Sequence, residues 1–310
     1  MSDEILPQIH SILEPKTGTW QYIVADPETK DAIIIDSVLD FDPTTNTVGN
    51  TTAENLLSQV SENDYNIVAI LETHAHADHL TAAAYLQQAL MSKGKPQAPI
   101  CIGEHITQVQ ATFAPRYGVD VAEYTGTFDR LLAVGDEVQV GRLAARVVAL
   151  PGHTPDSIGY VVGSSDAFVG DSLFQPDVGS ARCDFPGGDA RTLFRSVTGT
   201  LYQLPEACRL HVGHDYPPGG DARTEPRDAA TVGESRRSNK HMRDGVAEDE
   251  FVTWRAERDS TLAEPRLIHQ ALQFNIRAGR LPKAGDTGQR FIKVPIKIPD
   301  DVLKRGFAQG

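Results

Sequence analysis

The 310-residue sequence has few cysteines, no long apolar run and fewer basic than acidic residues. Cys101, Cys183 and Cys208 are widely spaced and form neither a CxxC zinc pattern nor a secreted-type disulfide framework, which favours a reducing compartment. No apolar run approaches the ~18 residues that a membrane-spanning helix needs. With 29 basic and 42 acidic residues the net charge is −13, so we expect neither nucleic acid nor anionic membrane as a partner.

The sequence also lacks the GxSxG, Walker A and GxGxxG motifs of several large enzyme classes. Cys183 could act as a nucleophile beside a histidine, but no neighbouring feature supports this. The acidic start MSDEILPQIH has the pattern of neither a signal peptide nor an Arg-rich presequence, so we expect a cytoplasmic location. The composition, 40% hydrophobic and 23% charged, is that of a globular protein.

Short apolar runs between polar turns predict an α/β protein rich in strands. Residues 20–25 and 32–36 are expected to form a hairpin, and Ile67–Leu71 a buried strand. Thr51-Thr52-Ala53-Glu54 has the spacing of a capping box and predicts the start of a helix. The alternating residues 290–299 (RFIKVPIKIP) predict a further strand.

The character of the sequence changes near Tyr216. Residues 217–227 are rich in glycine and proline, and residues 234–259 are densely charged. We therefore predict a core domain over residues 1–216 and a C-terminal extension over residues 217–310 that packs on this core.

Histidines and aspartates occur where the predicted strands end. Four of them lie within six positions directly after the strand at 67–71, and three more follow later strands singly. Neutral imidazoles and carboxylates bind borderline divalent metals, and a rigid sheet can direct such ligands into one cleft. The pattern predicts a metal site that closes when the chain folds, built from His74, His76, Asp78, His79, His153, Asp171 and His214.

The string THAHADH after a strand, followed in order by the isolated His153, Asp171 and His214, resembles the metallo-β-lactamase superfamily. This resemblance covers roughly residues 15–216 and implies a four-layer αββα sandwich with metal at the sheet edges. Longer strings, among them ILETHAHADHLTAA (70–83) and ARCDFPGGDARTLF (181–194), are similar to the persulfide dioxygenases, the ETHE1-like or Blh-type sulfur dioxygenases.

The second resemblance implies one non-haem Fe(II) per chain, held by His74, His153 and Asp171. Two histidines and one carboxylate leave coordination positions open for other ligands. In such an enzyme glutathione persulfide and O₂ are the substrates, and sulfite and glutathione are the products of this step in sulfide metabolism. His76 is expected to lie against the iron site without binding the metal.

The same resemblance implies that Arg182, Tyr216 and Arg277 contact the glutathione part of the substrate. A guanidinium suits its carboxylates because it donates two parallel hydrogen bonds. Relatives of this kind also suggest a homodimer.

The histidine pattern leaves a second function open. Asp78, His79 and His214 match the second metal position of the glyoxalase II thioesterases, which are hydrolases with two metals such as Zn and act on glutathione thioesters. The sequence shows no clear equivalent of the basic helical extension that these hydrolases carry. A third possibility is a metal-holding protein without turnover.

Overall fold

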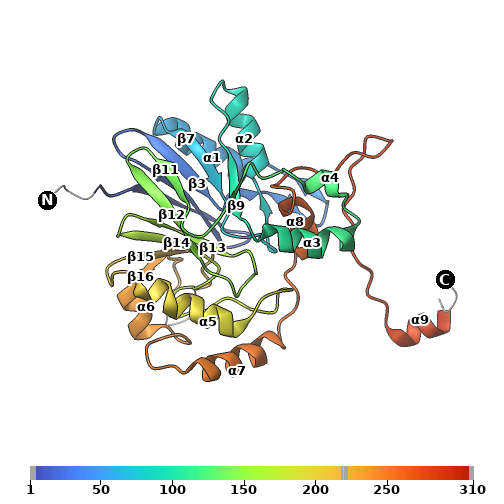
Figure 1. Cartoon of the computed structure of the whole chain (residues 1–310). Helices are drawn as coiled ribbons and strands as arrows, with labels where there is room; N and C mark the ends of the chain where they lie inside the picture. The colour runs from blue at the N-terminus through green and yellow to red at the C-terminus, as the bar shows by residue number, and fades with distance from the viewer. Residues whose placement is uncertain (1–4, 218, 220–222, 307–310) are drawn as a thin grey trace.

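Two β-sheets packed face to face form the centre of the protein, and helices cover both outer faces (Figure 1). The computed structural model describes residues 5–217, 219 and 223–306. The first sheet has the strand order β1-β2-β3-β7-β9-β10 and the second β11-β12-β13-β14-β15-β16. This arrangement confirms the predicted four-layer αββα sandwich.

The first sheet comes from the N-terminal part of the chain and the second from the middle. The strands of the first sheet are β1 (Gln8–Glu14), β2 (Thr19–Ala25), β3 (Asp31–Ile35), β7 (Asn66–Leu71), β9 (Ile100–Gly103) and β10 (Arg130–Leu132). Those of the second are β11 (Glu137–Val140), β12 (Leu143–Ala149), β13 (Ile158–Val162), β14 (Asp166–Gly170), β15 (Arg209–Val212) and β16 (Ala229–Thr231). Two small pairs are β4 (Val38–Leu39) with β8 (Leu80–Thr81), and β5 (Phe41–Asp42) with β6 (Thr47–Val48).

The helices divide between the two outer faces (Figure 1). Those that pack on the first sheet are α1 (Thr51–Glu62), α2 (Ala83–Ser92), α3 (Ile106–Tyr117) and α8 (Ile268–Asn275). The second sheet is covered by α5 (Ala190–Gly199), the 3₁₀ turn η1 (Leu201–Gln203), α6 (Val232–Ser238) and α7 (Glu248–Asp259). The short α4 (Val121–Tyr124) follows α3, and α9 (Asp300–Gly306) stands away from the body. Within the described residues, no helix is long and apolar enough to cross a membrane.

Three apolar clusters hold these layers together. One lies between the two sheets and contains Tyr22, Ile33 and Phe168, each at most 1% exposed. The other two lie between each sheet and its helices. Strands β3 and β13 are buried on both faces, and their sequences are accordingly almost continuously apolar.

Most predicted elements of the core are present. The hairpin forms as β2 and β3, which pair antiparallel with Tyr22 opposite Ile35. The helix start at Thr51 is confirmed, but the predicted capping box is wrong. The carboxylate of Asp40 instead accepts hydrogen bonds from the backbone N–H of Thr52 and from its hydroxyl, so the cap comes from the preceding loop.

The predicted strand at 290–299 is wrong. Apart from a single bridge between Arg290 and Ala284, this segment pairs with no strand in the described part of the chain, and Phe291, Val294 and Ile296 are 66%, 55% and 84% exposed. Alternation favours a strand only where a sheet edge is free to pair with it, and here none does. Other parts of the segment after residue 217 do bury apolar side chains in the helix-covered clusters, such as Phe251 and Leu272. The domain boundary at 216 stays a prediction.

Candidate metal centre

The predicted metal-binding residues follow the ends of four strands at one edge of the sandwich. His74, His76, Asp78 and His79 lie in the loop after β7, a strand of the first sheet. The other three residues follow strands of the second sheet: His153 comes after β12, Asp171 after β14 and His214 after β15. The site therefore spans both sheets, and only the folded sandwich brings its halves together.

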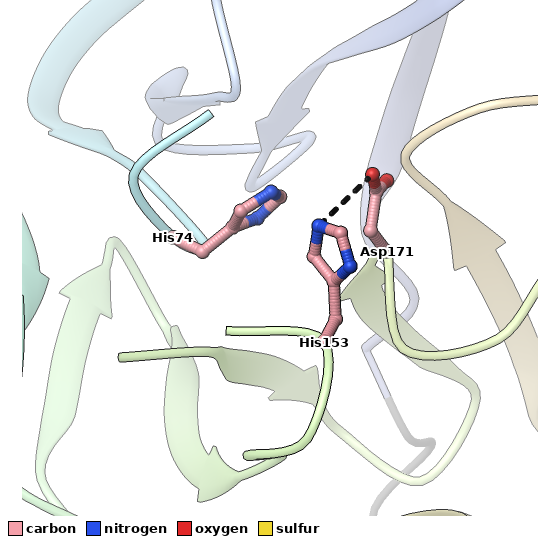
Figure 2. Close-up of side chains that lie close together, drawn as sticks. All are labelled: His74, His153 and Asp171. Carbon is pink, nitrogen blue, oxygen red and sulfur yellow. Dashed lines mark ion pairs between the residues drawn. The ribbon is translucent and has the colours of Figure 1, made fainter. Parts of the chain in front are cut away.

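His74, His153 and Asp171 converge on one small space, as Figure 2 shows. One donor atom of each lies within 4.8 Å of the donors of the other two. Nε2 of His153 is 3.7 Å from Oδ2 of Asp171. Nε2 of His74 and Oδ1 of Asp171 are buried and have no hydrogen-bond partner among the described residues. Because buried polar atoms are normally paired, these two atoms fit a cation that the chain itself does not supply.

A glycine lets the two halves of this triad meet. Gly170, at the end of β14, has a φ of +51°, and a Cβ there would lie 2.4 Å from Oγ1 of Thr73. A side chain at this position would push β14 away from the loop that carries His74. Glycine thus brings Asp171 beside His74. This histidine is the first of the four candidate donors after β7, His74, His76, Asp78 and His79, which we call the histidine ladder.

The remaining residues form a second group next to the triad. His76, Asp78 and His79 each offer a donor atom within 4.8 Å of the others. Nε2 of His214 lies 3.1 Å from Oδ2 of Asp78 and 3.6 Å from Oδ2 of Asp171, so this histidine faces both groups. Nε2 of His79 is buried and has no partner in the described part of the chain. These side chains have the donor atoms to bind a second cation. They equally suit a second role, in which they form hydrogen bonds around the ligands of a single cation at the triad.

Buried hydrogen bonds orient the histidines of the triad. Nδ1 of His153 donates to the carbonyl of Arg182 at 2.7 Å, which leaves its Nε2 free for a metal. Nδ1 of His74 lies 2.9 Å from the Thr73 hydroxyl, which donates to Asp36. Asp36 also accepts from the Thr73 backbone and contacts Nε2 of His76 at 3.1 Å. The sequence analysis did not identify Asp36, which lies far from the ladder in sequence.

Two histidines of the centre differ in charge, since His74 is neutral and His214 is protonated. Burial, together with His76 and His153 nearby, holds the pKa of His74 well below its usual value, so its ring is neutral and able to bind a cation. Burial opposes the charge on His214, but Asp171 and Asp78 more than offset it and raise its pKa to about 9. His214 therefore stabilises the two carboxylates wherever no cation does so.

Four of the seven predicted metal-binding residues line a cavity of about 870 Å³ between the sheet edge and α7. Asp78, His153, Asp171 and His214 form its floor. Its walls carry six lysines and arginines, namely Lys16, Arg182, Lys240, Arg255, Arg258 and Arg266. Of these, Lys16, Lys240, Arg258 and Arg266 form no ion pair with any residue that the structure describes. A protein of net charge −13 thus presents a basic chamber above its metal donors.

Arg182 and Tyr216 both line this cavity, as their predicted role requires. Tyr216 is 52% exposed, and its ring stacks on that of His214 with the centroids 5.8 Å apart. The Arg182 guanidinium makes two hydrogen bonds of 2.6 Å to Asp184 and a third to the Ala263 carbonyl. Arg182 and His153 also line a second cavity of about 950 Å³ beside α3.

Arg277 lies elsewhere. It is 3% exposed, its guanidinium pairs with Glu123 at 2.6 Å, and its Nε donates to the Gln273 carbonyl. It does not line either of the two cavities that reach His153. This geometry gives the predicted substrate contact of Arg277 no support, and its guanidinium instead joins α8 to the segment after α3.

The basic residues of α7 were missed. Arg255 and Arg258 are three positions apart, so they lie on the same side of the helix, and both line the cavity. In the sequence, residues 234–259 stand out only by their many charged side chains, and no basic helical extension is evident. The i, i+3 spacing of these arginines was the available signal.

Comparisons with known proteins agree with this geometry. The sequence profile described as "Metallo-beta-lactamase superfamily" matches residues 16–214. A "probable metallo-hydrolase" of Burkholderia pseudomallei is 42% identical over 299 residues, which cover 93% of this chain and 98% of that protein. "Glyoxylase B2" of Dictyostelium discoideum is 41% identical, with 96% and 98% covered. The chain spans 65% of a "beta-lactamase hydrolase-like protein" of Xylella fastidiosa, at 43% identity.

Two further similarities concern persulfide dioxygenases. The protein named "Persulfide dioxygenase ETHE1, mitochondrial" in Bos taurus is 29% identical over 272 residues, with 87% of this chain and 88% of that protein covered. The crystal structure of ETHE1 from Myxococcus xanthus superimposes with a TM-score of 0.68 at 28% identity, and covers 88% of this chain and 100% of that one.

Proposed function

Because the chain belongs to the metallo-β-lactamase superfamily, we propose that it is a glutathione-dependent persulfide dioxygenase with one non-haem Fe(II). In this reaction glutathione persulfide, O₂ and water give glutathione and sulfite. The observation that carries the proposal is a triad of two histidines and one carboxylate, of which His153 and Asp171 line a basic chamber. The similarity to ETHE1 in sequence and structure supports it.

His74, His153 and Asp171 would hold the iron, since two of them have buried donor atoms without partners and His74 is neutral. Bound there, the iron would supply the redox chemistry that joins O₂ to sulfur. Two imidazoles and one carboxylate fill only part of its coordination sphere, which leaves room for substrate.

The chain's own task is to bind and orient the sulfur donor. Glutathione carries two carboxylates, and the chamber walls offer Lys240, Arg258 and Arg266 without competing ion pairs. Arg182 lines the chamber, and its own backbone carbonyl orients His153. Contacts with the carboxylates of glutathione would hold the persulfide sulfur close to the candidate metal donors. The sulfur would then meet the metal in one orientation instead of by random collision.

A dinuclear thioesterase of the glyoxalase II kind is the second candidate. The observation that favours it is the group of Asp78, His79 and His214 beside the triad, which fits a second cation. The basic face of α7 and the hydrolase names of several relatives also agree with it. Both reactions act on glutathione derivatives, so the basic chamber serves either one.

Metal content and oxygen consumption distinguish these candidates. The protein is prepared without metal and then loaded anaerobically with Fe(II) or with Zn(II). We expect about one iron per chain and O₂ uptake that depends on glutathione persulfide, with one sulfite formed per O₂. Two tightly held metals per chain, with hydrolysis of lactoylglutathione and no O₂ uptake, would replace the proposal by the thioesterase. A loaded protein without either activity would leave a metal-holding role.

A further inference from the structure

We propose that Asn275 is a positioning residue for the metal centre, and that through it the C-terminal segment completes the ligand loop. Asn275 is the last residue of α8, outside the part of the chain that the superfamily profile matches. It is 3% exposed, and its amide lies against the loop that carries the histidine ladder.

The amide of Asn275 is satisfied on both sides by backbone of this loop. Its Nδ2 donates to the carbonyls of His76 and His79, both at 2.8 Å. Its Oδ1 accepts from the N–H of Thr81 at 2.9 Å. These three hydrogen bonds require a short side chain with two N–H donors and one acceptor. Asparagine is the only natural side chain of this length that has them. The contact therefore fixes the path of residues 76–81.

A second close contact follows directly after the helix. Gly279 has a φ of +78°, and a Cβ there would lie 2.7 Å from the carbonyl oxygen of Thr81. The chain can pass this close to the ligand loop only with glycine at this position. Asn275 and Gly279 together form what we call the latch.

The latch continues into the buried polar network of the metal site. The Thr81 hydroxyl donates to Glu72, whose other oxygen is 3.3 Å from Nε2 of His76. His76 contacts Asp36, which accepts the hydroxyl of Thr73, next to Nδ1 of His74. Every side chain in this chain of contacts is at most 2% exposed. Hydrogen bonds and one ion-pair contact, that between Glu72 and His76, therefore link α8 to a triad histidine.

This connection has a functional consequence. Residues 76–79 carry the donors of the second group, and they lie outside every strand of the described residues, so no strand pairing holds their carbonyls. Outer hydrogen bonds that orient metal ligands typically change affinity by about 10–100-fold when removed. Loss of the latch should thus loosen metal binding even though Asn275 touches no metal donor.

The test measures metal binding, not turnover, in the full-length protein. Asn275→Asp keeps the acceptor for Thr81 but turns the donor edge into an acceptor facing two carbonyls, and Asn275→Ser shortens the side chain. For both, we expect Co(II) and Zn(II) affinities at least about tenfold weaker in chelator competition. We also expect changed d–d absorption of the Co(II) form, which reports ligand geometry. Gly279→Ala should act in the same direction.

A matched control exists in the same chain. Asn239 is also fully buried, and its amide likewise donates to one backbone carbonyl and accepts from two backbone N–H groups, but it contacts none of the ladder. Asn239→Ser should lower the melting temperature of the metal-free protein without changing the Co(II) spectrum. Folded Asn275 variants with unchanged metal affinity and spectrum would overturn the proposal. An equal loss of affinity in Asn239→Ser would also overturn it, because general destabilisation would then explain both. Neither outcome depends on which reaction the metal supports.

Discussion

The backbone carbonyl of Arg182 accepts a hydrogen bond of 2.7 Å from Nδ1 of His153. One residue thus orients a metal-binding histidine with its backbone and lines the basic chamber with its side chain. In the proposed function, the loop of Arg182 would therefore couple the position of the metal to the position of the substrate. Substitutions in this loop can be separated by whether they change metal content or substrate binding.

Replacing Asp171 with alanine should remove the metal. Asp171 is the only carboxylate of the triad, so its loss leaves two neutral imidazoles to hold a dication. We expect a metal content near zero after dialysis, measured by elemental analysis. Asp166→Asn, at the other end of the same strand, should lose stability but keep its metal. Full occupancy in the Asp171 variant would show that the ligand assignment is wrong.

Arg182→Ala should weaken substrate binding while leaving the metal in place. The change removes the guanidinium but keeps the carbonyl that orients His153, so we expect KM to rise about tenfold with little change in metal content. Asp184→Asn should act in the opposite direction, because it removes the negative charge and one of the two oxygens that accept hydrogen bonds of 2.6 Å from the guanidinium. An effect of Arg182→Ala on kcat alone would contradict a role in binding.

Charge reversal in the chamber should affect KM in a salt-dependent way. Arg258→Glu and Arg266→Glu place anions where the substrate carboxylates are proposed to lie, so KM should rise severalfold or more. The difference from the parent protein should shrink as ionic strength increases. Arg237→Glu is the control, since Arg237 is exposed and outside the chamber. Equal effects of all three substitutions would point to net charge and not to a binding wall.

The contact between the buried His211 and the partly exposed Asp228 should make stability depend on pH. Burial opposes charge on His211, but Asp166 at 2.8 Å and Asp228 at 3.7 Å more than offset it and raise its pKa. In turn, His211 lowers the pKa of Asp228 to about 2. The edge of the Tyr22 ring packs against His211, and Arg209 also pairs with Asp166.

The sign follows from linkage. The stabilisation from His211 is full below about pH 6.5, its usual pKa, and is lost as the pH rises through its raised pKa. That from Asp228 is present above its ordinary pKa of 3.8 and is lost as the pH falls through about 2. His211→Gln should therefore cost about 1–3 kcal/mol near pH 5, and less near pH 9, in urea unfolding. His105→Gln, at an exposed site, is the control. A loss independent of pH would contradict the assignment.

The candidate metal donors could be predicted from the sequence because their signal is local. His74, His76, Asp78 and His79 are close in sequence, and the single His153, Asp171 and His214 each follow an apolar run. A run of buried residues predicts a strand, and a strand end at a sheet edge can direct a side chain into a shared cleft. The candidate donors therefore followed from patterns spanning a few residues, whereas the four-layer class followed from the resemblance to the metallo-β-lactamase superfamily.

What surrounds the donors depended on contacts between residues distant in the sequence. Asp36, Asn275 and the arginines of α7 reach the site across many tens of residues, and no short pattern relates them to the ladder. The same reason explains the wrong strand at 290–299, since pairing requires a free edge that alternation alone does not reveal. Local periodicity thus determined which side chains could bind a metal. Long-range packing decided which hydrogen bonds hold them, and which charged side chains line the adjoining cavity.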